Sequence, residues 1–393
     1  MCNMVDATSP GRSGSLRILF VAPAARAGTV QYTHNLANAL TLSGHRVILA
    51  TGVGFELSDY PREYDTIEVF DRYRPRPVKF VRFLWKCLLF RPHLVHLQGA
   101  QHPALYIALW AMLAALGAGR FVYTPQDVLP NSLRPYHIRA FRFLYARMRH
   151  VFLNAKQNEA LVIENFGVPR ERITVLPIAD LTAFVREHVP PECPKLPTGK
   201  KVVLCFGLIE PRKGIGTLIS AAPEVIRHEP DTLILIVGKP LMDLAPLEKQ
   251  IAELGLADHV RIVPHYVTFA QMAGYFSAAR LVVLPYENGW NSGVLASALG
   301  FGKPVVATRV GGFDEVIAEG STGFLIAPRD PAALAQALVQ LLQDEALYTR
   351  MVRNVQQAAG DISWEAIART TEARYMDILG TRVNCEVSQA RQY

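Results

Sequence analysis

The chain has 393 residues, of which half are hydrophobic and 19% are charged, and its formal net charge is +7. This composition is typical of a soluble globular protein rather than a disordered or fibrous one, and the length favours two domains that each bury a core. Residues 1–190 hold 22 basic and 13 acidic residues, whereas residues 191–393 hold 19 and 21. The basic first half indicates an anionic partner: a membrane surface, a lipid diphosphate or nucleic acid.

Neither the cysteines nor the apolar segments indicate an exported or membrane-spanning chain. The five cysteines are scattered without a CxxC pair, which favours a reduced cytosolic protein. Residues 1–15 are small and polar without a signal-peptide core, and we expect a disordered leader there. The longest apolar run, Ala104–Gly119, has 16 residues against the roughly 20 of a spanning helix, and predicts a buried crossover helix.

The first half alternates short apolar strands with helical patterns. Strands are predicted at 16–23, 44–52, 92–98, 120–127 and 150–155, and a helix at Tyr32–Ser43. This alternation predicts a parallel, doubly wound sheet over residues 16–180. A run with five prolines and little periodicity follows at 177–200, and we place the interdomain linker at 181–200.

A second alternation predicts a second α/β domain over residues 201–365. Its six apolar strands read VVLCFG, TLILIVG, HVRIVPH, LVVLPY, PVVAT and GFLIA. Trp364–Leu379 is a final amphipathic helix, and we assign residues 366–393 to this helix and a tail. Two such sheets form a cleft at the carboxyl ends of their strands, where open α/β sheets bind ligands.

Two glycine-bearing turns of the second domain carry the strongest functional signal. In CFGLIEPRKGIG, Arg212 and Lys213 precede a helix, and in NSGVLASALG, Ser292 and Gly293 begin another. Cations and helix N-terminal amides suit phosphate binding. The two turns together predict a pocket for the diphosphate of a donor.

The chain resembles the retaining family-4 glycosyltransferases, which have the GT-B fold: two Rossmann-like doubly wound domains facing across a cleft. The matching segments are GLIEPRKG, VLPY, SGVLASALGFGKPVVAT, VGGFDEVI and GSTGFLIAPRDPAALAQAL, with looser matches at RILFVAP, LANALTLSGHRVILATG and VYTPQDVLP. The resemblance implies that the first domain binds the acceptor, that the second binds a nucleotide-sugar, and that the last helix crosses back onto the first domain. It covers roughly residues 16 to 380.

The resemblance assigns the diphosphate to both domains. Lys213 falls on the family's diphosphate lysine and Arg212 on an adjacent arginine, and we predict both to be catalytic through leaving-group stabilisation. Further donor-diphosphate contacts are predicted at Gly28 and at Asn291–Val294, that is Ser292, Gly293 and Val294. The alternatives are a solvated helix start, a plain turn and an ordinary N-cap.

Nucleoside recognition departs from the usual family pattern. Two glutamates common in the family are absent, their positions being Gly289 and Ser297. We predict nucleoside contacts from Tyr266, Val267 and Ser297, and Glu287 is a possible substitute for a missing glutamate. A subgroup of the family with PY and SGV lacks these glutamates, and the chain resembles it.

Donor-sugar contacts are predicted at three residues and acceptor activation at one. Gln126 stands where the family often has a histidine, and Gly312 and Glu315 belong to VGGFDE. Asp127 is the candidate for orienting or deprotonating the acceptor, so we count it as catalytic. For Asp127 and Glu315 the alternative is helix capping. No DxD or HExxH pattern is present, so we predict no metal and no cofactor beyond the donor substrate.

The resulting prediction is transfer of a hexosyl unit from a UDP- or GDP-sugar, with retention, to a lipid-linked glycan or polysaccharide precursor. The alternatives are a UDP-sugar 2-epimerase of the same fold and a non-catalytic nucleotide-sugar-binding partner. The segments 71–92 and 133–150 mix cations with aromatics at helical spacing, which suits an interfacial helix. The alternative is a core helix with a solvated basic face. We therefore expect cytoplasmic protein held peripherally at the inner face of an anionic membrane, and no binding of nucleic acid, since no recognition module is present.

Overall fold

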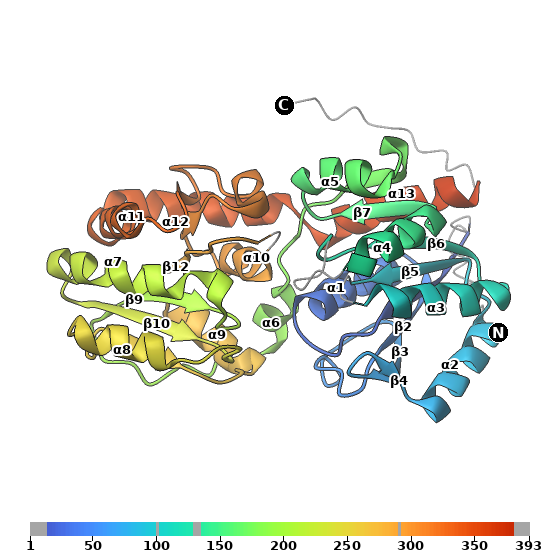
Figure 1. Ribbon diagram of the computed structural model, residues 1–393, viewed down its shortest axis with the longest axis horizontal. Helices are drawn as coiled ribbons and strands as arrows, with labels where there is room; N and C mark the ends of the chain where they lie inside the picture. The colour runs from blue at the N-terminus through green and yellow to red at the C-terminus, as the bar shows by residue number, and fades with distance from the viewer. Residues whose placement is uncertain (1–13, 100–101, 129–134, 290–291, 381–393) are drawn as a thin grey trace, which may run out of the picture.

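The computed structural model describes residues 14–99, 102–128, 135–289 and 292–380 (Figure 1). The expected leader at 1–15 therefore lies almost wholly outside the described residues, as does the tail beyond residue 380.

The N-terminal domain is built on one eight-stranded sheet. Its strands are β1 (Arg17–Ala22), β2 (Arg46–Gly52), β3 (Asp65–Asp71), β4 (Arg74–Pro75), β5 (Leu94–Gln98), β6 (Arg120–Thr124), β7 (His150–Leu153) and β8 (Ile173–Val175). They lie in the order β4-β3-β2-β1-β5-β6-β7-β8, and every pair is parallel except β3 with β4. The helices of this half are α1 (Gly28–Leu42), α2 (Pro77–Phe90), α3 (Pro103–Ala115), α4 (Pro135–Arg147), α5 (Gln157–Phe166) and α6 (Ala183–His188).

The C-terminal domain repeats the plan with six parallel strands. These are β9 (Lys201–Phe206), β10 (Thr232–Val237), β11 (Val260–Val263), β12 (Leu281–Leu284), β13 (Val305–Thr308) and β14 (Gly323–Ile326), in the order β11-β10-β9-β12-β13-β14. The helices are α7 (Ile215–His228), α8 (Ala245–Glu253), α9 (Phe269–Ala278), α10 (Gly293–Gly300), α11 (Pro331–Gln343), α12 (Glu345–Asp361) and α13 (Trp364–Leu379). The predicted pair of doubly wound domains is confirmed.

Helices on both faces explain why the strands are almost continuously apolar. In β1, Ile18 and Phe20 belong to the core under α1 and α13, whereas Leu19 and Val21 belong to the core under α2 and α3. Alternate side chains of a strand point to opposite faces, so a strand covered on both faces needs apolar residues throughout.

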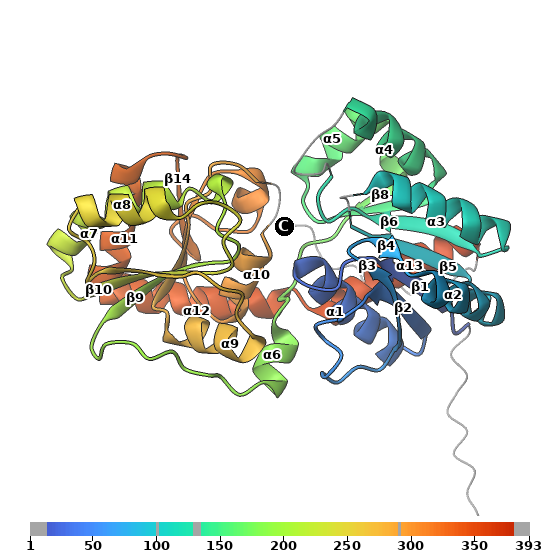
Figure 2. The same cartoon turned by 60° about the horizontal axis from the view of Figure 1, so that its bottom comes forward.

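Helix α13 comes from the end of the chain but packs on the N-terminal domain, beside α1 (Figures 1 and 2). The Trp364 ring packs edge-on against Tyr32 at 5.1 Å between centroids, and its Nε1 donates to the Asp180 carbonyl at 2.8 Å. Near the other end, the Tyr375 hydroxyl lies 2.5 Å from Nδ1 of the buried His96. These contacts tie the end of the second domain to the core of the first.

Three local features differ from the expectations. Strands β3 and β8 were not predicted, and the proline-rich 181–200 segment contains the short helix α6, with Phe184 and Val185 buried. The apolar run at 104–119 forms the crossover helix α3 between β5 and β6, but only one side is buried and alanines carry the exposed side. The boundaries expected at residues 180, 200 and 365 stay predictions.

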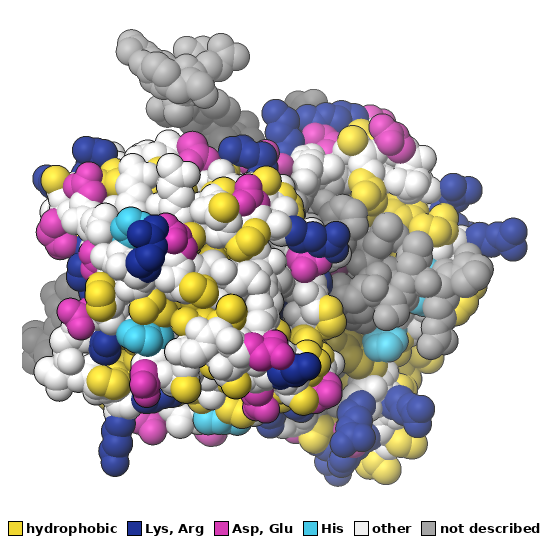
Figure 3. All heavy atoms as spheres, turned by 60° about the vertical axis from the view of Figure 1, so that its left-hand side comes forward, with side chains coloured by type: hydrophobic (Ala, Val, Ile, Leu, Met, Phe, Trp, Pro, Cys, Tyr) yellow, Lys and Arg dark blue, Asp and Glu magenta, His cyan; other side chains and the backbone are white. Residues whose placement is uncertain are grey.

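The surface also bears on how the protein could meet a membrane. Among the described residues, no helix is both long and apolar enough to cross a bilayer. Figure 3 looks onto the C-terminal domain, where basic and acidic side chains are mixed over most of the visible face. By residue count, the excess positive charge of the chain lies in residues 1–190.

The buried His96 predicts an acid-sensitive fold. Burial, aided by the nearby His150, lowers the pKa of His96 to about 3. The unfolded chain, with a histidine pKa of about 6.5, binds more protons below that pH, so the stabilisation is complete above pH 6.5 and is lost as pH falls towards 3. We expect this residue alone to lower the free energy of unfolding by about 2 kcal/mol between pH 6.5 and 5. Urea unfolding at both pH values measures the loss, and an NMR titration of the His96 ring near pH 6.5 would contradict it.

Candidate functional site

A cavity of about 260 Å³ lies where β9, β10 and β11 end, and the start of α1 closes it from the N-terminal domain. Both domains contribute to its lining, mostly through residues at strand ends and in the first turns of helices. The lining residues are Ala27, Gly28, Gln31, Phe206, Gly207, Leu208, Glu210, Arg212, Lys213, Gly238, Lys239, Tyr266, Val267, Phe269, Met272, Ser292, Gly293, Val294 and Ser297. Nine of the thirteen predicted site residues line this one cavity.

Lys213 is the buried cation of the cavity. Only 7% of its surface is exposed, its Nζ donates to the Tyr286 hydroxyl, and it lies 3.7 Å from the centroid of that ring. The alternative of a solvated helix start is therefore wrong for Lys213. The next residue, Gly214, has φ 63°, and a Cβ there would collide with the Pro285 carbonyl, so this tight turn requires glycine.

Arg212 lies between two carboxylates from different domains. Its guanidinium pairs with Glu210 at 2.6 Å, while its Nε is buried without a hydrogen-bond partner among the described residues. Burial raises the pKa of Asp127, which follows β6 in the other domain; the charge of Arg212 opposes the rise and that of Glu210 adds to it. Asp127 does not line the cavity, but it is close enough to Arg212 to feel its charge.

The start of α10 supplies the predicted anion-binding helix terminus. Ser292 is its N-cap and accepts from the Leu295 N–H at 3.3 Å, so the ordinary capping role is present. The Ser292 hydroxyl also lies 3.2 Å from the Tyr286 hydroxyl, which links it to Lys213. Ser297 donates to the Gly293 carbonyl at 2.8 Å, which leaves its oxygen available only as an acceptor. Asn291 lies outside the described residues.

Gly28 lines the cavity and follows a turn with an unusual backbone conformation. It is the first residue of α1, and a Cβ there would make only an ordinary contact, 3.8 Å from Leu181. The unusual conformation belongs to Ala27, with φ 72°, whose carbonyl accepts from Val30 and Gln31. The positive φ of this turn therefore lies at Ala27, and Gly28 does not use the conformational freedom of glycine.

Of the two predicted nucleoside residues that follow β11, Tyr266 also connects the domains. The Tyr266 hydroxyl donates to Glu56 at 2.7 Å, and Glu56 accepts from the Ala27 N–H at 2.6 Å. Burial raises the pKa of Glu56, and the hydrogen bonds from Tyr266 and Ala27 oppose the rise. Val267 is almost fully buried, so it offers the cavity a fixed backbone and an apolar wall.

None of the three predicted donor-sugar residues is among the residues that line the cavity. Gln126 donates to the Gln98 side chain at 3.1 Å and accepts from Asn154 at 3.3 Å. Gly312 lines a small neighbouring cavity that also contacts Ser292. The Glu315 carboxylate accepts from the backbone N–H groups of Lys156 and Gln157, at 2.6 and 2.8 Å. Glu315 therefore caps α5 of the other domain, and the capping alternative describes its contacts.

Some cavity residues were missed, and one proposed substitute is engaged elsewhere. Lys239 follows β10 after one glycine, and this Gly-Lys pair at a strand end is the signal that identifies it. Glu210 and Gln31 have no comparable signal in the sequence. Glu287 forms two hydrogen bonds with Arg329, at 2.5 and 2.8 Å, so its carboxylate is already paired. Within the described residues, no three His, Cys, Asp or Glu side chains gather as metal ligands do, and metal independence stays a prediction.

Comparison with protein families covers both domains. Residues 27–179 match the family described as "Glycosyl transferase 4-like domain", and residues 200–344 match "Glycosyl transferases group 1". The phosphatidyl-myo-inositol mannosyltransferase of Mycobacterium leprae is 35% identical over 284 residues, which are 70% of each chain. The D-inositol 3-phosphate glycosyltransferase of Streptomyces avermitilis is 35% identical over 188 residues, 46% of this chain and 40% of the relative. The chain spans about half the length of several such relatives.

Solved structures of similar fold cover nearly the whole chain. Sucrose-phosphate synthase of Thermosynechococcus elongatus superposes with a TM-score of 0.73 at 22% identity, over 93% of this chain and all of that one. The Anabaena protein HepE, solved with UDP-glucose, superposes with a TM-score of 0.71 at 18% identity, over 91% and 100%. At these identities the likeness establishes the fold alone.

The contact between Glu315 and α5 gives a testable prediction. Glu315→Gln removes a charged cap, which is worth about 0.5–2 kcal/mol, and we expect faster amide hydrogen exchange at Lys156 and Gln157. The neighbouring exposed Asp314→Asn is the matched control and is expected to leave exchange unchanged. Equal exchange in the wild type and Glu315→Gln would show that the cap does not hold α5 in solution.

Proposed function

Because the chain belongs to the family-4 glycosyltransferases of the GT-B fold, we propose that it transfers a hexosyl unit from a UDP- or GDP-sugar to an acceptor, with retention at the anomeric carbon. Retention rests on the family. The observation that carries the donor assignment is the interdomain cavity, where Lys213 and Arg212 face the N-terminal end of α10. HepE, which shares the fold, has been solved with UDP and with UDP-glucose, which supports the choice of ligand.

The proposed chemistry is stabilisation of the leaving diphosphate. Negative charge develops on the diphosphate as the glycosidic bond breaks, and fixed cations lower the energy of that transition state. Lys213 is held by Tyr286 and buried, so its charge is oriented before the donor arrives and is poorly screened by water. The N-terminal amides of α10 add donors on the other side of the cavity.

Asp127 is proposed to orient or deprotonate the acceptor hydroxyl. The pKa of Asp127 is raised towards neutral pH, which suits proton transfer by its carboxyl group. Arg212 acts on both partners, because it faces the diphosphate cavity and its charge stabilises ionised Asp127. Gln126, Gly312 and Glu315 are proposed to lie near the donor sugar, and Glu315 would have to leave the start of α5 to contact it.

The acceptor is proposed to be a lipid-linked glycan or polysaccharide precursor at an anionic membrane surface. Relatives named phosphatidyl-myo-inositol mannosyltransferase support a lipid acceptor. Helix α2 supports membrane contact, since Val78, Val81, Trp85 and Leu89 are all more than 60% exposed along one side. Arg82 and Lys86 add exposed cations there. Helix α4 is less suited, because Phe141, Leu144 and Tyr145 are buried in the core.

Replacing the buried lysine tests the donor site. Lys213→Met keeps most of the side-chain stem but removes the charge, and loss of one such contact typically slows transfer by about 10² to 10³. At 100 times Kd, we expect UDP- or GDP-sugars to add about 2.7 kcal/mol to the free energy of unfolding of the wild type and so to raise its unfolding temperature. We expect them to raise the unfolding temperature of Lys213→Met much less. Lys249→Met, on the exposed side of α8, is the control. Normal turnover in Lys213→Met would remove the lysine from the site. Epimerised sugar without an acceptor would favour the epimerase, whereas nucleotide release that depends on an acceptor is the result expected for a transferase.

Chelation tests metal independence. With Arg212, Lys213 and the start of α10 as the diphosphate ligands, we expect EDTA to leave the transfer rate unchanged. Activity lost in EDTA and restored by magnesium or manganese would contradict this part of the proposal.

Vesicle flotation tests the membrane surface. Trp85→Ser with Leu89→Ser removes two exposed apolar side chains from α2, and we expect weaker recovery with anionic vesicles. Leu241→Ser, an equally exposed position of the C-terminal domain, is the control. Recovery of the wild type that does not depend on anionic lipid or salt would favour a soluble acceptor instead.

A further inference from the structure

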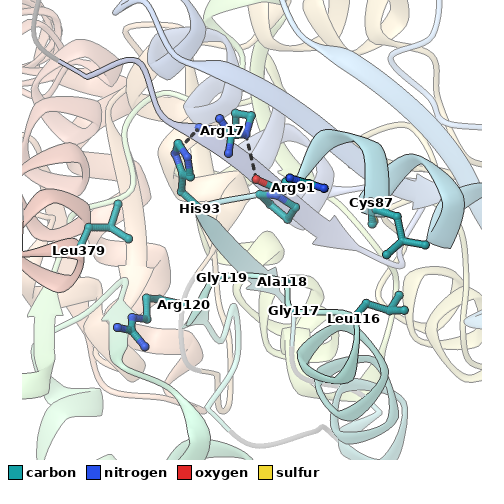
Figure 4. A pocket seen from close by; sticks show the side chains of 12 residues that line it. Arg17, Cys87, Arg91, His93, Leu116, Gly117, Ala118, Gly119, Arg120 and Leu379 are labelled. Carbon is teal, nitrogen blue, oxygen red and sulfur yellow. Dashed lines mark hydrogen bonds between the residues drawn. The ribbon is translucent and has the colours of Figure 1, made fainter.

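A second cavity, of about 760 Å³, opens at the opposite edge of the N-terminal sheet, away from the donor site (Figure 4). It lies where β1, β5 and β6 begin, and is bordered by the last turns of α2, α3 and α13. In Figure 4, Leu379 and Arg120 lie on one side of it and Cys87 and Leu116 on the other, with Arg17, His93 and Arg91 between them.

The polar side chains of this cavity are basic. Arg17, Arg91, Arg120 and His93 line it, and no Asp or Glu is among its described lining residues. None of the three arginines forms an ion pair with a carboxylate of the described residues. Other arginines of the described residues often do pair with an aspartate or glutamate. Arg17 and Arg120 begin β1 and β6, the strands on either side of β5, so their backbones lie about 10 Å apart. They start on opposite faces of the sheet, and a shared anion therefore needs both long side chains to reach around its edge into the cavity that they line.

Two of these groups are fixed so that they present donors. The Nε of Arg17 donates to the Arg91 carbonyl at 2.8 Å, which holds the guanidinium in place. Its terminal N–H groups take no part in this bond and are available to bind an anion. The Nδ1 of His93 accepts from the Arg17 N–H at 3.3 Å, so the neutral ring carries its proton on Nε2. Burial, with the Arg17 charge, lowers the pKa of His93, which favours that neutral form.

We propose that this cavity binds a phosphate group through the guanidinium groups of Arg17, Arg91 and Arg120 and the Nε2–H of His93. Guanidinium groups donate in a planar fork that matches phosphate oxygens. The backbone N–H groups of Gly119 and Arg120 already donate to Pro92 and His93, so the side chains supply the binding. The proposal does not depend on the transfer reaction.

The phosphate has two possible sources: the headgroup of a membrane lipid or a soluble phosphate compound. Leu88 lines the cavity and is part of the exposed apolar surface of α2, so an apolar chain attached to the phosphate has a surface to follow. A competing explanation is that the cations only stabilise the C-terminal ends of α2, α3 and α13, where helix dipoles are negative.

The test variant combines Arg91→Gly with Arg120→Gln. Arg91 has φ 47°, so glycine removes its guanidinium without straining the backbone, and Arg17 keeps its carbonyl partner. Arg353→Gln, an exposed arginine of α12, is the control for lost charge. Lys213→Met is measured alongside, because it affects only phosphate bound in the donor cavity.

In the soluble arm, inorganic phosphate is titrated while NMR follows the arginine Nε–H signals. We expect the Arg17 signal to shift, and the double variant to weaken this response by about tenfold, while Arg353→Gln and Lys213→Met leave it unchanged. In the lipid arm, binding to phosphatidylcholine vesicles is compared with either phosphatidate or oleate added to equal surface charge. Selective loss of phosphatidate binding in the double variant assigns the site to a lipid phosphate, and loss in the soluble arm alone assigns it to a soluble compound.

An Arg17 signal that does not respond to phosphate, together with vesicle binding no weaker in the double variant than in Arg353→Gln, would overturn the proposal. The same conclusion follows if the double variant lowers the unfolding temperature but binds both probes like the wild type, because the arginines would then serve only the helix ends.

Discussion

The parallel direction of the strands determines where this protein can do chemistry. In a βαβ unit the helix carries the chain back to the end of the sheet where the strands begin, so the strand-to-helix turns of a domain meet at the opposite edge. In the C-terminal domain, that edge gathers the turns after β9, β10 and β11 and the start of α10 around one cavity. The N-terminal domain brings the first turn of α1 to the same place. Helix α13 fastens the two halves through Trp364 and Tyr375, which reach Asp180 and His96 in the first half.

Within that cavity, a buried lysine explains how the proposed diphosphate site needs only a few charged side chains. Lys213 cannot be desolvated without a partner, and the hydroxyl and ring of Tyr286 supply one that carries no opposing charge. Its charge is therefore available to a diphosphate. Arg212 differs, since Glu210 already neutralises part of it and Asp127 lies nearby. In the proposed reaction, this division assigns Lys213 to the leaving group and Arg212 to the coupling of the leaving group with the acceptor side.

Much of this arrangement is predictable from the sequence. The remaining features cannot be predicted, for physical reasons. The six strands of the second domain are mainly apolar runs ended by turn residues, interrupted in β11 only by Arg261, so this pattern identifies them. Strand β3, with mixed polarity near the sheet edge, has no such pattern. The glycine-bearing turn at Lys213 is local in sequence, so the sequence alone identifies it as a candidate phosphate site. Contacts such as Glu315 with Lys156 join residues far apart in the chain, and nothing local distinguishes a sugar ligand from a cap.

The central claim is that the interdomain cavity holds the donor diphosphate, and a crystal structure of the protein with UDP or GDP tests it most directly. The account predicts phosphate oxygens within hydrogen-bond distance of Lys213 Nζ and of the N–H groups at the start of α10, with the nucleoside against Val267. A diphosphate bound elsewhere, with Lys213 still joined only to Tyr286, would contradict it.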